Sequence, residues 1–162
     1  MMTGPETKPE TKPNCRILVK VSGDLVHNED FFEWLKSFST ADSDITVLCG
    51  GGTAITEELE ANDVPFEFGP AGRKILTERG INLAYEVLQR QREQFENELK
   101  NKRIEAKVAM PVIYIGDMIC HVNGDWYIRA VYPNFDKIYV ATLTGRSKSF
   151  DGFERIEVVS FN

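Results

Sequence analysis

Residues 16–23 read RILVKVSG, and residues 45–52 read ITVLCGGG. Each segment is an apolar, β-rich run that ends in glycine, which is typical of a buried strand that enters a turn. The backbone N–H groups exposed after such a strand bind phosphate or carboxylate oxygens, particularly beside a fixed lysine. Lys20 and the glycines Gly50, Gly51 and Gly52 therefore predict an anion site where a phosphoryl group moves.

Apolar runs and helical periodicity alternate along the rest of the chain. Strands are expected at 17–21, 45–49, 108–115 and 137–143, with one more possible at 155–161. Helices are expected after the N-cap Asn28, from the N-cap Thr53 to Ala61, at 78–102 and from 123–125 to Val131, while 62–74 should be a loop. This alternation predicts an α/β fold, a three-layer sandwich with a mostly parallel central sheet. The loops after the strands would then meet at one edge of the sheet.

The size of the chain, 162 residues, suits one domain with a full core. We expect residues 15–162 to form that domain. Residues 1–14 contain the sequence ETKP twice and should be a disordered tail.

The composition excludes several kinds of partner. A net charge of −6 argues against binding nucleic acid through phosphate contacts. No run of 18 apolar residues and no signal peptide are found, so no membrane partner and a cytoplasmic location are expected. Cys49 and Cys120 lie in apolar runs and should be reduced core residues. Neither His27 nor His121 has the neighbours of a metal site, so none is expected.

The order of the segments resembles the amino acid kinase family, which includes acetylglutamate, aspartate, glutamate and uridylate kinases. The resemblance covers about residues 16–146 and rests on four motifs that occur in the family's order. The first two are Lys20-Val21-Ser22-Gly23 and Val47 to Ile55, which contains the three glycines. The other two are Phe68 to Arg73, and His121-Val122-Asn123-Gly124-Asp125 followed by Lys137 to Gly145. Ser22 replaces a glycine of the family, and Cys49 replaces its usual histidine. The resemblance implies that this chain forms an amino acid kinase-like N-terminal lobe.

The same resemblance implies a role for each candidate residue. Lys20 would stabilise the phosphoryl group, and Asp125 would orient the catalytic lysine. The substrate contacts would come from Gly23, Gly50–Gly52, Arg73 and Asn123. Each has a structural alternative: a solvated lysine or arginine, a turn that needs positive φ, or a helix cap. Asp117 is a further candidate polar group at the same edge.

Two functions remain open on this resemblance. The first is a phosphotransferase that uses ATP and Mg²⁺ and phosphorylates a small carboxylate or phosphate. The second is a non-catalytic protein that binds a small anionic molecule or has a regulatory role, and an inactive fragment is a third possibility. Family kinases continue past the strand that ends at Gly145, where only 17 residues follow here, and Lys148 is not an obvious substitute for their second lysine. We therefore expect weak or absent ATP binding.

The helix at 78–102 is expected to carry a homodimer interface, as in many amino acid kinases. Its buried line would be Ala84, Val87, Leu88, Phe95 and Leu99. Ile81, Leu83 and Tyr85 add apolar surface elsewhere on the helix, which a second copy would cover. Alternatively, Leu83 and Tyr85 pack under the 62–74 loop of a monomer.

Overall fold

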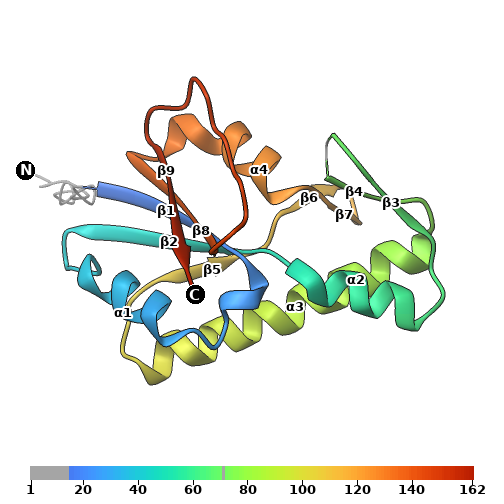
Figure 1. Ribbon diagram of the computed structural model, residues 1–162, viewed down its shortest axis with the longest axis horizontal. Coiled ribbons are helices and arrows are strands. Elements are labelled where there is room, and N and C mark those ends of the chain that lie inside the picture. Colours follow the sequence, from blue (N-terminus) through green and yellow to red (C-terminus); the bar gives the residue numbers. More distant parts are fainter. Residues whose placement is uncertain (1–14, 71) are drawn as a thin grey trace, which may run out of the picture.

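The computed structural model describes residues 15–70 and 72–162 (Figure 1). The predicted disordered tail lies outside the described residues. Five parallel strands form the central sheet, in the order β5-β2-β1-β8-β9. Their bounds are β1 Cys15–Val21, β2 Ser43–Cys49, β5 Lys107–Ala109, β8 Lys137–Leu143 and β9 Ile156–Phe161. The predicted three-layer α/β sandwich with a parallel sheet is confirmed.

Helices cover both faces of this sheet (Figure 1). They are α1 Glu29–Ser37, α2 Gly52–Ala61, α3 Glu78–Asn101 and α4 Gly124–Val131, and two short 3-10 helices span Gly23–Leu25 and Tyr132–Asn134. The larger core cluster includes Ile17, Val19 and Val21 with apolar residues of α1, α2 and α3. The smaller cluster joins Leu18, Val140 and other strand residues to Ile128 of α4. Side chains of β1 therefore alternate between the two layers, as the strand period of two requires.

The N-caps and the buried helix face that the sequence predicts are partly confirmed. Asn28 caps α1, because its side chain accepts a hydrogen bond from the Phe31 N–H. The predicted cap at Thr53 is wrong: α2 begins at Gly52, and its N-cap Gly51 offers no side chain. In α3, the predicted line of Ala84, Val87, Leu88, Phe95 and Leu99 is buried. Gln91, which interrupts that line, is buried as well.

Two small hairpins replace elements that the sequence predicted differently. The expected loop at 62–74 contains the antiparallel pair β3 (Phe66–Gly69) and β4 (Gly72–Ile75). The expected strand at 108–115 ends early, because Met110 and Pro111 separate β5 from β6 (Val112–Ile115). β6 leaves the sheet and pairs with β7 (Met118–His121). Proline cannot donate a ladder hydrogen bond, which explains the break.

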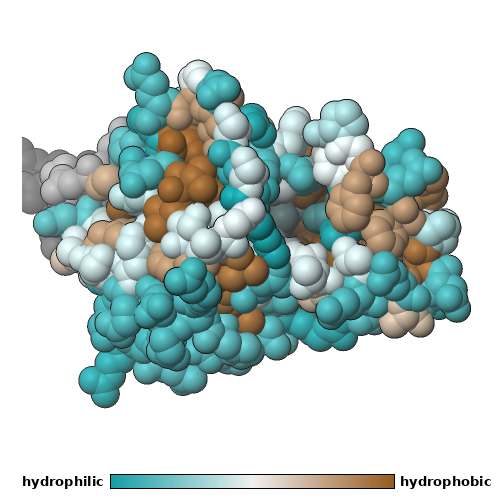
Figure 2. Space-filling view, in the orientation of Figure 1, coloured by the Kyte–Doolittle hydropathy of each residue, from teal (hydrophilic) through white to brown (hydrophobic). Residues whose placement is uncertain are grey.

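The apolar surface near these hairpins bears on the predicted homodimer. Leu83 and Tyr85 pack partly against the core and stay partly exposed. Phe68, Leu76 and Met118 are exposed, and Figure 2 shows apolar side chains gathered at the end of the molecule that carries the β3–β4 hairpin. The dimer through α3 stays a prediction.

Two further predictions concern cysteine and membranes. Cys49 is buried as predicted, whereas Cys120 lies in a surface hairpin and is only partly buried. Within residues 15–70 and 72–162, no helix has the length and apolar character that crossing a membrane requires.

Candidate functional site

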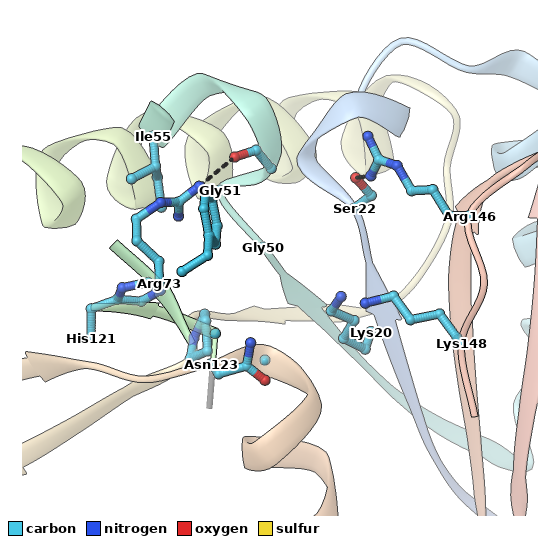
Figure 3. A pocket seen from close by; sticks show the side chains of 15 residues that line it. Lys20, Ser22, Gly50, Gly51, Ile55, Arg73, His121, Asn123, Arg146 and Lys148 are labelled. Atoms are coloured by element: carbon cyan, nitrogen blue, oxygen red, sulfur yellow. Dashed lines mark hydrogen bonds between the residues drawn. The ribbon is translucent and has the colours of Figure 1, made fainter. Parts of the chain in front are cut away.

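Two lysines meet one carboxylate at the C-terminal edge of the sheet. The Asp125 Oδ1 atom lies 3.3 Å from Lys20 Nζ, and its Oδ2 atom accepts a hydrogen bond of 2.7 Å from Lys148 Nζ. Lys20 belongs to β1, Asp125 to the first turn of α4, and Lys148 to the segment between β8 and β9. We call this segment, residues 144–155, the strap. Three distant parts of the sequence thus converge on one carboxylate. Figure 3 shows the side chains of Lys20 and Lys148 side by side.

The direction of Lys20 follows from the strand period. Leu18 and Lys20 lie two residues apart and therefore share a face of the sheet. Leu18 packs in the core cluster beneath α4, so Lys20 faces α4 as well. Asp125 lies at the start of that helix, where Asn123 is the N-cap and accepts a hydrogen bond of 3.0 Å from the Trp126 N–H. The alternation of one strand and the capping of one helix are enough to produce the ion pair.

The glycines after β2 form another wall of the site. Gly52 has a φ of +54°, which strongly favours glycine. Gly50 has no such need: a Cβ atom there would come no nearer than 3.5 Å to the Val21 carbonyl oxygen, an ordinary contact. A turn that needs positive φ therefore explains Gly52 but not Gly50. The first N–H groups of α2 have no side-chain cap, so they are available to an anion.

The strap contributes a second cation, Arg146. Its guanidinium donates to Ser22 Oγ at 3.0 Å and to Asp24 Oδ2 at 2.6 Å. The other carboxylate oxygen of Asp24 accepts a hydrogen bond of 2.6 Å from Thr53 Oγ1. This network joins the strap to the loop after β1 and to the first turn of α2.

The two hairpins and their flanks supply the remaining wall, with Arg73, His121 and Asn123 (Figure 3). Arg73 is not the solvated arginine of the alternative interpretation. Its Nη2 atom donates to Thr56 Oγ1 at 2.8 Å and to the Gly52 carbonyl oxygen at 3.3 Å, while its buried Nε atom has no partner. Arg73 also stacks over the rings of Phe66 and Phe68.

These walls enclose a cavity of about 300 Å³. Ligand pockets commonly measure about 300–1,000 Å³, so this one suits a small molecule. Four cationic side chains line it, in a protein whose net charge is −6: Lys20, Arg73, Arg146 and Lys148. The carboxylates of Asp24 and Asp125 pair with three of these cations. The local excess of positive charge favours an anionic ligand.

Burial and charge shift the pKa values of this site. Burial lowers the pKa of Lys20 from 10.5; Asp125 opposes this shift, and Lys148 and Arg146 add to it. Burial alone would raise the pKa of Asp125, but the lysines hold it below 3.8. Burial, with help from Arg73, lowers the pKa of His121 to about 4. At neutral pH, His121 is therefore uncharged and Asp125 is ionised.

The structure brings most of the predicted site residues together. Lys20, Gly50–Gly52, Arg73 and Asn123 line the cavity, and Asp125 is bound to its lysines. Gly23 does not line it: it packs behind the cavity, where a Cβ atom would lie 2.6 Å from the Gly50 carbonyl oxygen. Asp117 lies in the turn between β6 and β7 and lines a different cavity.

Sequence reasoning missed the contribution of the strap. The sequence does not single out Lys148 as a substitute for the family's second lysine, yet Lys148 makes the shortest contact to Asp125. A signal was present, because Arg146 and Lys148 directly follow β8, and loops after parallel strands share one edge. Among the described residues, no three His, Cys, Asp or Glu side chains lie close enough together to hold a metal ion.

Comparisons with known proteins find a shared fold but identify no function. No protein-family model and no curated protein matches this chain. Among solved structures, the chain is similar to smu.665 from Streptococcus mutans UA159, with a TM-score of 0.62 and 14% sequence identity. The match covers 85% of this chain and 75% of that one. At this identity the likeness shows a shared fold alone.

Proposed function

We propose that this protein is a small phosphotransferase that moves the γ-phosphoryl group of ATP onto a carboxylate or phosphate oxygen of a small acceptor. The observation that carries the proposal is the Lys20–Asp125–Lys148 cluster facing the uncapped start of α2. Phosphoryl transfer depends on positioning and on electrostatic stabilisation more than on covalent chemistry of the protein. Two fixed ammonium groups and a row of N–H donors supply both.

Asp125 gives each lysine a defined place. An ammonium group carries three N–H donors. Asp125 Oδ2 accepts a hydrogen bond from Lys148, whereas Lys20 lies 3.3 Å from Oδ1 as an ion pair without a hydrogen bond, so most of these donors stay available to phosphoryl oxygens. During transfer, the acceptor oxygen forms a bond to the γ-phosphorus while the bond to the ADP oxygen breaks, and ADP leaves with that electron pair. Lys20 and Lys148 would then stabilise the negative charge on the transferred group.

The residues fit the phosphates of ATP better than they fit an isolated metal ion. Magnesium usually keeps several waters and binds through substrate phosphates and one or two carboxylates. The nearby carboxylates, Asp24 and Asp125, are engaged by Arg146 and the lysines. Mg²⁺ would therefore be held mainly by the phosphates of ATP, and its chemistry would be to neutralise their charge.

The experiment is an assay of ADP release with ATP–Mg²⁺ and a panel of acceptors: UMP, glutamate, aspartate and acetylglutamate. We expect release that depends on one acceptor and falls about a hundredfold to a thousandfold in Lys148→Met. Lys137→Met is the matched control, because Lys137 lies at the opposite end of β8 and pairs with Glu157. No acceptor-dependent release across the panel, or equal losses in both variants, would contradict the proposal.

The size of the cavity favours a second candidate, a protein that only binds a small anion. A volume of about 300 Å³ is at the low end for ligand pockets. Such a cavity is small for ATP and an acceptor together, so part of ATP would lie outside it. Thermal shifts with the same ligands separate the candidates, because a ligand of the native state raises the melting temperature. An acceptor that stabilises the protein without ADP release supports binding alone.

A further inference from the structure

An arginine outside the cavity joins the strap to α4. Arg129 donates through Nη1 to the Asp125 carbonyl oxygen at 3.2 Å and through Nη2 to the Ser149 carbonyl oxygen at 3.2 Å. Its guanidinium also lies over the Phe150 ring, 4.6 Å from the centroid. One planar group therefore bridges two backbone positions and stacks on a third residue, a geometry that lysine cannot reproduce.

These two backbone positions are the ones that matter for the lysine–carboxylate pair. Asp125, whose carbonyl Arg129 holds, carries the carboxylate, and Ser149 directly follows Lys148 in the chain. The Lys148 Nζ to Asp125 Oδ2 contact of 2.7 Å lies next to this bridge. Arg129 thus ties together the main-chain segments from which both partners of the ion pair extend.

The strap needs such a tie because it has no regular structure of its own. Between β8 and β9 it forms neither helix nor strand. Fixing the backbone of a residue costs conformational entropy, so contacts from outside must hold Lys148 in place. Arg129 is exposed and does not line the cavity. Its contacts therefore act on the site only through the strap.

We propose that Arg129 is a positioning residue that holds Lys148 against Asp125. Its role in catalysis rests on the proposed phosphotransferase function, but its effect on the Lys148–Asp125 pair does not. The structure supplies a matched arginine for comparison. Arg155, at the far end of the strap, donates to the carbonyl oxygens of Tyr132 and Phe135 and lies over the Tyr132 ring at 4.0 Å.

The first readout is the titration of the Asp125 carboxyl, followed by carbon-13 NMR and assigned with Asp125→Asn. In Arg129→Met, Lys148 would leave the carboxylate, and the pKa of Asp125 would rise by roughly half a unit to one unit. Arg155→Met should leave it unchanged. Arg129→Lys, which keeps the charge but not the planar bridge, should give a smaller rise. Phe150→Leu removes the stacking surface without changing Arg129 and should also raise it.

The second readout is calorimetric binding of inorganic phosphate. We expect affinity to fall by roughly threefold to tenfold in Arg129→Met and to stay constant in Arg155→Met. If the Asp125 titration shifts while wild-type protein shows neither phosphate binding nor ADP release, the positioning role stands and the proposed function fails. An Asp125 titration that is the same in Arg129→Met as in wild type, or that shifts equally in Arg155→Met, would overturn the inference. If Arg129→Met does not fold, the Asp125 titration is measured in Phe150→Leu instead, and a titration equal to that of wild type would overturn the inference.

Discussion

The cavity has a sheet side and a strap side, which carry similar groups but are built differently. On the sheet side, Lys20 and Gly50 stand at the ends of β1 and β2, and the parallel register fixes them by pairing Lys20 with Leu48. On the strap side, Arg146 and Lys148 stand on a segment without strand or helix. Side-chain contacts with Asp24, Asp125 and Arg129 hold that segment in place.

One site thus combines a part whose geometry is fixed by the backbone with a part whose geometry is fixed by side-chain contacts. Backbone hydrogen bonds and core packing position the sheet side, so its geometry depends little on charge. Charge pairs at the surface are weakened by salt, whereas buried ones are screened much less. Arg146 is 37% exposed and Lys148 26%, against 14% for Lys20. High salt should therefore loosen the strap side first.

The largest expected effect comes from breaking the sheet side. Gly23→Ala would push a methyl group to 2.6 Å from the Gly50 carbonyl oxygen, and the backbone would have to move. We expect the free energy of unfolding in urea to fall by about 3 kcal/mol. Arg146→Met on the strap side should cost less than about 1 kcal/mol, because its ion pair is partly solvated. Equal losses would mean that the two sides are not built differently.

The hairpin wall differs from both sides, because its His121 is buried in the uncharged form. Burial lowers the pKa of His121 from 6.5 to about 4, so between these values the unfolded chain binds a proton that the folded chain does not. Stability from this residue is present above pH 6.5 and is lost as pH falls toward 4. Allowing for partial exposure, we expect a loss of about 1 kcal/mol between pH 7 and 5.

His121→Gln isolates this effect. Urea unfolding of the variant should show a flatter dependence on pH between 7 and 5. Asp24 and Asp125 do not interfere, because their pKa values lie below 3.8. The same slope in variant and wild type would show that His121 is not held neutral by the fold.

The smallest expected change in fold stability comes from Gly50→Ala, which tests ligand approach on the sheet side. The added Cβ atom makes only ordinary contacts, so the free energy of unfolding should change by less than about 1 kcal/mol. Because Gly50 lines the cavity, the methyl group should still weaken inorganic phosphate binding about tenfold. Gly69→Ala is the control, since nothing lies within 4 Å of its added Cβ. Phosphate affinity unchanged in Gly50→Ala would remove the glycine loop from the site.

The sequence predicted the sheet side well and the strap side poorly, for a physical reason. Lys20 and Gly50–Gly52 stand at the ends of apolar runs, and the topology of a parallel sheet brings such ends together. Their position after β8 places Arg146 and Lys148 at the same edge, but the strap has no periodicity, so the sequence does not show which of its side chains reaches Asp125. The helix cap was similarly misplaced: Thr53 follows the glycines, but its hydroxyl binds Asp24, and Gly51 becomes the N-cap.

The hairpins were missed because their strands are short and lie largely at the surface. Glu67 to Gly69 and Ile113 to Ile115 are exposed, so these segments show no alternation of buried and exposed positions. The pairing of β6 with β7 instead depends on a turn at Gly116, which has a φ of +62°. Asp117 was assigned to the site edge because the expected strand ran on to Ile115, whereas the chain leaves the sheet after Ala109.

In the proposed function, sheet-borne Lys20 and strap-borne Lys148 hold one phosphoryl group together, and calorimetric titration of inorganic phosphate measures this joint contact. The protein, Lys20→Met, Lys148→Met and the double variant would be compared at constant ionic strength. We predict that each single change weakens binding at least about tenfold and that the double variant loses less than the two single losses combined, because both lysines contact the same ion. Phosphate affinity that is unchanged in Lys148→Met would contradict the account.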